Sequence, residues 1–107
     1  MAEKKPKNIF VDGSISPVKI GEDIANHQKK TSIGAHSIFL GQVRADSLSD
    51  GVVSAIEYSA HQEMALIAMH EIREAIFAKY PLTCLHITHS LGLVKVGEIC
   101  LFVFASA

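Results

Sequence analysis

Arg44 is the residue of this sequence whose position best suits chemistry on a small anion. It ends an apolar run and opens a polar loop, which is where a rigid scaffold tends to present functional side chains. A guanidinium there offers a fixed fork of donors that matches a phosphate or a carboxylate. The alternative is a surface arginine with a local carboxylate partner such as Asp46, and position alone favours this second interpretation.

Histidine and cysteine residues do not form a known metal motif. His70 and Glu74 share a helix face and resemble the zinc-protease pattern H-E-x-x-H with its second histidine replaced, but Arg73 beside them favours a solvated face. His86 and His89 are three apart in a predicted strand, so they point to opposite faces and cannot chelate one ion together. We expect no metal site. With no phosphate loop, G-x-G-x-x-G or G-x-S-x-G motif, we also expect no cofactor.

The length and composition indicate a single domain over residues 1–107 in which residues 1–7, polar and lysine-rich, are frayed. Apolar residues make up 49% of the chain, enough for a core without disulfide or metal staples. The net charge of -1 argues against a dedicated nucleic-acid binder, although it leaves room for a local cationic pocket.

The two cysteines, Cys84 and Cys100, lie in apolar surroundings with no C-x-x-C pattern, which is typical of buried thiols in a reducing compartment. The charged start of the chain has no apolar segment behind it, and no apolar run approaches the length of a membrane span. We therefore expect a cytoplasmic protein.

The spacing of apolar residues predicts strands and helices that we expect to form an α+β fold with a mostly antiparallel sheet. Strands are predicted at Ile9–Val11, Gly34–Val43, Val52–Tyr58, Leu82–Ser90 and Ile99–Ala105, and helices from Pro17 to about Lys30 and from His61 to Tyr80. Gly41 is a possible bulge or close-approach site. The second and third strands are joined by the short polar loop 45–51, so we expect them to be antiparallel partners. Residues 92–97, bracketed by two glycines, are expected to form a short connection.

The long predicted helix carries an apolar stripe that we expect to pack on the sheet. The stripe comprises Met64, Ile67, Ala68, Ile72, Ala75 and Ile76.

The predicted strand Ile99–Ala105 is apolar without alternation, which is typical of a strand buried on both faces. Such a strand needs a covering layer, and little chain follows it to supply one. Either another subunit covers it or the sequence is a truncated version of a longer domain. We therefore expect a homo-oligomer, most simply a two-fold dimer.

Four segments, in order and with compatible spacing, make residues 9–107 resemble the large, catalytic subunit of molybdopterin synthase. They are Gly34–Arg44, similar to a G-A…F-x-G-x-V-R strand; Glu57–Ala65, similar to L-E-Y-E-x-Y-x-x-M-A; Tyr80-Pro81, a helix terminator; and His86–Glu98, similar to H-R-x-G-x-x-x-x-G-E. Two positions depart from the pattern: Ser90 stands where the family usually has arginine, and Gln42 replaces a commonly basic or small residue.

The resemblance implies an α/β hammerhead-like domain that dimerises, with a mostly antiparallel sheet packed by one long and one shorter helix. It implies a sulfurtransferase: the large subunit receives the C-terminal tail of a small ubiquitin-like sulfur-carrier subunit. Sulfur then passes from the thiocarboxylate of that tail to cyclic pyranopterin monophosphate, forming molybdopterin in molybdenum cofactor biosynthesis.

The resemblance also assigns roles to residues. Gln42, Val43 and Arg44 match the substrate-contacting strand end, with Arg44 as the anion anchor. The expected catalytic lysines lie beyond Ala107, in a segment ending near P-x-W-K-K-E, so no catalytic residue is assigned within the chain. Two alternatives stay open: a non-catalytic α+β binding or assembly module, and an inactive truncated product.

Overall fold

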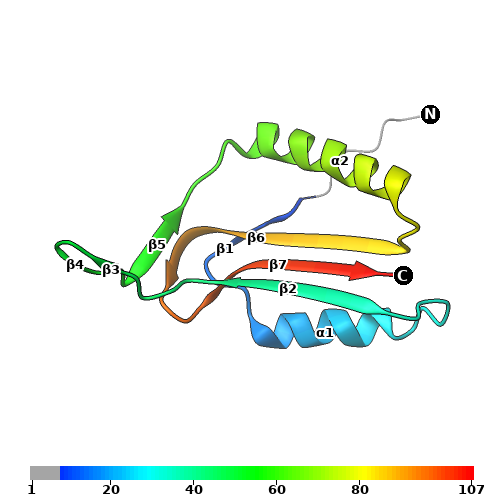
Figure 1. Cartoon of the computed structure of the whole chain (residues 1–107), viewed down its shortest axis with the longest axis horizontal. Coiled ribbons are helices and arrows are strands. Elements are labelled where there is room, and N and C mark those ends of the chain that lie inside the picture. The colour runs from blue at the N-terminus through cyan, green and yellow to red at the C-terminus, as the bar shows by residue number, and fades with distance from the viewer. Residues whose placement is uncertain (1–7) are drawn as a thin grey trace.

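The computed structural model describes residues 8–107, and the expectation of a frayed segment at 1–7 falls outside them. Two helices and seven strands follow one another along these residues (Figure 1). In chain order they are β1 Phe10–Asp12, α1 Pro17–His27, β2 His36–Gln42, β3 Ser47–Leu48, β4 Gly51–Val52, β5 Ala55–Tyr58, α2 Gln62–Lys79, β6 Cys84–Lys95 and β7 Ile99–Ser106.

The main sheet has the order β1-β6-β7-β2, and β5 pairs with the last part of β6. Only β1 and β6 run parallel among the strand pairs of residues 8–107; the other pairs are antiparallel. The two helices lie on opposite faces of this sheet, α2 on one side and α1 on the other (Figure 1). The predicted α+β fold with a mostly antiparallel sheet, one long helix and one shorter helix is therefore confirmed.

The predicted pairing of the second and third strands is wrong. Strand β2 pairs with β7, and β5 pairs with β6. The strongly apolar β7 lies between β6 and β2, and β5 pairs with the last part of β6, so β2 has β7 as its partner and stays at the edge of the sheet. The predicted loop between them contains a small separate hairpin, β3–β4.

Strand β6 is longer than predicted and pairs with three other strands. It continues through Gly92 to Lys95, where we expected a connection, because β5 supplies hydrogen-bonding partners for Gly92–Lys95. Its earlier residues pair with β7 and with β1. The turn to β7 is instead made near Gly97, whose φ of 86° suits glycine.

Helix α1 begins and packs as its sequence indicates. The Ser16 side chain accepts from the Val18 amide, and Pro17 occupies the first turn. On its inner face Ile20 contacts a core that includes Phe102 and Phe104. The prediction that β7 is buried on both faces is wrong: alternate residues are buried towards α1, and those between are only partly covered.

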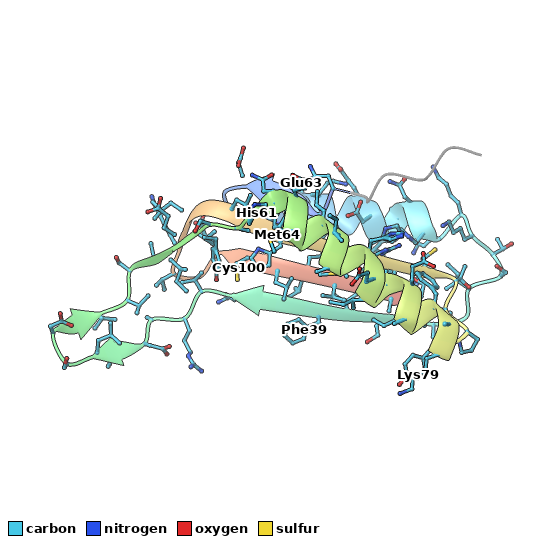
Figure 2. The ribbon with its side chains drawn as sticks, turned by 90° about the horizontal axis from the view of Figure 1, so that it is seen from above. Phe39, His61, Glu63, Met64, Lys79 and Cys100 are labelled. Carbon is cyan, nitrogen blue, oxygen red and sulfur yellow. The ribbon has the colours of Figure 1, made fainter. Side chains whose placement is uncertain are left out.

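The predicted packing face of α2 is wrong. Met64, Ile67 and Ile72 are 65%, 49% and 50% exposed, and no residue of α2, all of which the structure describes, is buried. The helix is apolar on two sides, so spacing alone could not select the inner one. The partly buried side includes Leu66, Arg73 and Phe77. Figure 2 shows α2 lying across the sheet, with Met64 near its start and Lys79 near its end.

None of the helices within residues 8–107 is long and apolar enough to cross a membrane.

Candidate functional site

The three predicted substrate-contacting residues lie at the end of β2, directly after a break in its register. The pairing of β2 with β7 shifts between Gly41 and Gln42. A Cβ atom at Gly41 would lie 3.0 Å from the Leu101 Cβ, so glycine permits the close approach of the two strands. The expectation of a bulge or close approach at Gly41 is confirmed.

Val43 holds this strand end in place with its side chain buried. It is 2% exposed and packs with Val94 and Cys100. Its amide donates to the Glu98 carbonyl at 3.0 Å, and its carbonyl accepts from the Gly97 amide at 2.9 Å. Val43 therefore positions its two neighbours, which are the residues that present side chains at the surface.

Gln42 lines a pocket of about 380 Å³ between the end of β2 and the segment before α1. Ser14 and Glu98 also line it, and the Glu98 carboxylate accepts from the Lys95 amide at 2.7 Å. The described lining holds no lysine or arginine. This pocket therefore suits a hydrogen-bonding group, whereas a phosphate would meet a carboxylate without a compensating cation.

Arg44 has the local carboxylate partner that the second interpretation of the sequence expects. Its Nε lies 2.5 Å from Asp46 Oδ1, and a terminal nitrogen lies 3.4 Å from Oδ2. The hydrogen bond and the charge of Asp46 raise the pKa of Arg44 above its usual value. The guanidinium is 84% exposed, so the pair is surrounded by solvent and weak, and another anion can compete for the guanidinium.

Tyr58 lies behind this strand end and was not singled out from the sequence. Its ring packs against the cluster of Val43, Val94 and Cys100, and its hydroxyl is hydrogen-bonded to the Cys100 thiol. That bond, with burial, raises the pKa of Tyr58 above 10.0. Both cysteines are free and buried, as expected. The pairing of β5 with β6 places Tyr58 here, which spacing along the chain could not indicate.

The histidines considered from the sequence lie as their spacing indicates. His70 and Glu74 are one turn apart on α2, with 4.0 Å between Nε2 and Oε1. His86 and His89 both belong to β6 and make different contacts: His86 lies against His27, and His89 against Tyr58.

Comparison with known proteins gives a consistent relationship. The family model described as MoaE protein matches residues 14–107. The molybdopterin synthase catalytic subunit of Pyrococcus abyssi is 33% identical over 104 residues, covering 97% of this chain and 63% of the relative. Catalytic subunit 1 of Aedes aegypti is 34% identical over 93 residues, covering 84% and 57%. The chain thus spans less than two thirds of the length of these relatives.

Solved structures of this class share the fold. The molybdopterin synthase of Staphylococcus aureus superposes with a TM-score of 0.75 at 24% identity, over 99% of this chain and 72% of that one. A complex of subunits 1 and 2 of the molybdopterin-converting factor from Helicobacter pylori gives 0.77 at 14% identity, over 92% and 63%. The match over residues 14–107, the curated relatives and the common fold agree, and the chain therefore belongs to the MoaE family.

Proposed function

We propose that this chain acts in molybdenum cofactor biosynthesis as the large-subunit domain of a molybdopterin synthase. In this proposal it receives the thiocarboxylated tail of a small ubiquitin-like subunit, and sulfur passes from that tail to cyclic pyranopterin monophosphate. The observation that carries the proposal is the family match over residues 14–107, together with relatives named as molybdopterin synthase catalytic subunits.

A small-subunit partner is supported by the Helicobacter pylori structure, which is a complex of the two subunits. Association with a second copy is supported by exposed apolar side chains on β2. Ile38, Phe39 and Leu40 of the edge strand β2 are 40%, 61% and 45% exposed. Unpartnered apolar surface of this kind favours burial against another chain. A reducing, cytoplasmic location is consistent with two free thiols.

Arg44 is the proposed anchor for an anion, either the pterin phosphate or the carboxyl end of the tail. Its guanidinium is already extended and held two residues from the rigid end of β2. An incoming phosphate would replace Asp46 and receive two charge-assisted hydrogen bonds from one fork. Gln42 then offers an amide to a neighbouring polar group in the pocket it lines. Val43 supports both from the core.

Sulfur transfer needs more than an anchor. The acyl carbon of the thiocarboxylate has to be attacked, or its sulfur released, with help from a positioned proton donor or amine. The two lysines nearest in sequence to the family motifs, Lys79 and Lys95, do not match the catalytic positions, and Lys79 lies at the far end of α2 (Figure 2). We therefore expect the 107-residue chain to bind its partners without turning over.

The test mixes the purified 107-residue protein with a thiocarboxylated small subunit and cyclic pyranopterin monophosphate. Titration calorimetry should detect binding of the small subunit, while assay of the oxidised, fluorescent pterin product should show negligible dithiolene. A small subunit that ends in an ordinary carboxylate serves as the matched control. Absence of binding would refute the proposed role, and turnover at a normal enzymatic rate would show that the catalytic groups are within these residues.

A further inference from the structure

Helix α1 ends at a histidine whose two ring nitrogens are not equivalent. Nδ1 of His27 lies 2.7 Å from the Asp23 carbonyl oxygen. A carbonyl can only accept, so Nδ1 carries a proton, and in the neutral ring Nε2 then presents a lone pair. Within residues 8–107 this Nε2 is buried and has no hydrogen-bond partner. An orphaned buried acceptor costs stability, and the same tautomer, held by a backbone carbonyl, is the one that binds metal ions.

Two side chains of β6 face this lone pair. Cys84 and His86 are two residues apart in the strand, so both point towards α1. One ligand atom from each of His27, Cys84 and His86 lies within 4.8 Å of the others. The thiol is 6% exposed, and the two imidazole rings have centroids 4.7 Å apart.

We propose that His27, Cys84 and His86 form a Zn²⁺ site. Two neutral imidazoles and one thiolate are a donor set that zinc prefers, with bonds of about 2.0–2.3 Å. Tetrahedral ligation at those lengths places donor atoms about 3.5 Å apart, so the three groups need to close by only about 1 Å. His27 and His86 also line a cavity of about 250 Å³, which gives the ion a route in and leaves a fourth position for water.

Lys30 is the group that opposes the ion. Its Nζ donates to Cys84 Sγ at 2.9 Å. Its positive charge repels a cation that approaches the same sulfur. Because Lys30 is exposed, it can turn into solvent when the metal binds. The other nearby cation, Arg73, lines the cavity but already donates to the Leu85 carbonyl.

This site joins the end of α1 to the start of β6, at the opposite end of the sheet from the end of β2 (Figure 1), and Gln42 is the last residue of β2. His36, which lies beside His27, is six residues along β2 from Gln42, a separation of about 20 Å. The ion would therefore stabilise the fold and would not depend on the proposed sulfur transfer. Its test needs no activity measurement.

The first experiment uses Co²⁺ as a spectroscopic probe on the metal-free 107-residue protein. We expect one equivalent to bind with a thiolate-to-cobalt charge-transfer band that Zn²⁺ abolishes by displacement. Cys84→Ser should remove the band, whereas Cys100→Ser, a change at the other buried thiol, should keep it. His70→Asn is a second control, because it removes the solvent-exposed histidine–glutamate pair on α2. No band in the unchanged protein, or a band that survives Cys84→Ser, overturns the proposal.

The second experiment keeps all three ligands. Lys30→Met removes the competing ammonium from an exposed position, so Zn²⁺ should bind about tenfold more tightly by competition with a chelating dye. Thermal melts should show a zinc-dependent rise in Tm for the unchanged protein and for Lys30→Met, and none for Cys84→Ser. Unchanged or weaker Zn²⁺ binding in Lys30→Met would contradict the proposed competition between Lys30 and the ion for Cys84.

Discussion

The Arg44 guanidinium and the Asp46 carboxylate lie 2.5 Å apart, Nε to Oδ1, two residues along one loop. Both side chains are largely exposed, at 84% and 51%. An exposed pair of this kind holds the Arg44 side chain in position but is easily broken, because water screens the attraction. Asp46 thus keeps the proposed anchor extended until a stronger anion arrives.

Replacing Arg44 with alanine should weaken binding of the thiocarboxylated small-subunit tail or the pterin phosphate by roughly ten- to a hundredfold. The reason is the loss of two charge-assisted hydrogen bonds from the guanidinium to the anion. Asp46→Asn is the matched variant: it keeps the loop and frees the guanidinium, so binding should stay equal or become tighter. Titration calorimetry measures both, and unchanged affinity in Arg44→Ala would refute the anchor role.

Gly41→Ala should destabilise the fold by about 1–3 kcal/mol, because the new methyl group would be forced against Leu101. Gly21→Ala is the control: this glycine lies in α1 with nothing within 4 Å, so the change should stabilise by about 0.5–1 kcal/mol. Urea denaturation with fluorescence or circular dichroism gives both values. Equal effects at the two positions would show that the strand contact at Gly41 is not limiting.

The stability of the fold should fall as the pH rises above 10.0, the usual pKa of tyrosine. The pKa of Tyr58 is raised in the folded chain, chiefly by the hydrogen bond to Cys100, so between the two pKa values the folded state holds more protons than the unfolded state. The contribution of Tyr58 to stability is fully present below pH 10.0 and is lost as the pH rises to the pKa of Tyr58 in the folded chain. Denaturant melts from pH 8 to 12 test this, and Tyr58→Phe should flatten the alkaline limb.

Light scattering of the purified chain should show a dimer at micromolar concentration, since the edge strand β2 exposes three consecutive large apolar side chains. Phe39, which points away from the sheet edge in Figure 2, is 61% exposed. Phe39→Lys should shift the population towards monomer. Val18→Lys is the matched control. Val18 is 70% exposed, but it lies on helix α1 and not on the edge strand β2. A stable monomer in the unchanged protein would contradict the prediction.

Local signals in the sequence predicted the elements well and their partners poorly. Ser16 and Pro17 start α1 because a hydroxyl cap and a fixed φ act within one turn. Strand pairing, by contrast, depends on which strands are available elsewhere. The loop 45–51 suggested that β2 and β5 pair, but β2 pairs with β7 and β5 pairs with β6, both of which come later in the chain. For α2, two apolar sides gave two equally good stripes, and the wrong one was selected.

The candidate site shows the same difference between local features, which the sequence predicts, and contacts between distant residues, which it does not. The position of Arg44 at a strand end followed from the change from apolar to polar residues. The burial of Val43 did not, because it depends on Val94 and Cys100, which β6 and β7 bring from far along the chain. The group of His27, Cys84 and His86 was missed for the same reason, since its first member is contributed by a helix distant in sequence.

The sharing of β6 among three strands also determines how the fold opens. At His89 the strand has neighbours on both sides, Phe10 of β1 and Leu101 of β7, and the His89 amide donates to the Ile9 carbonyl at 2.8 Å. Hydrogen exchange at this amide requires β1 to leave β6, whereas the separate β3–β4 hairpin can open alone and exchange quickly. In folding, the β6–β7 hairpin closes a short loop and should form early. Strand β1 must return from the other end of the chain, so its docking is the slow, late step.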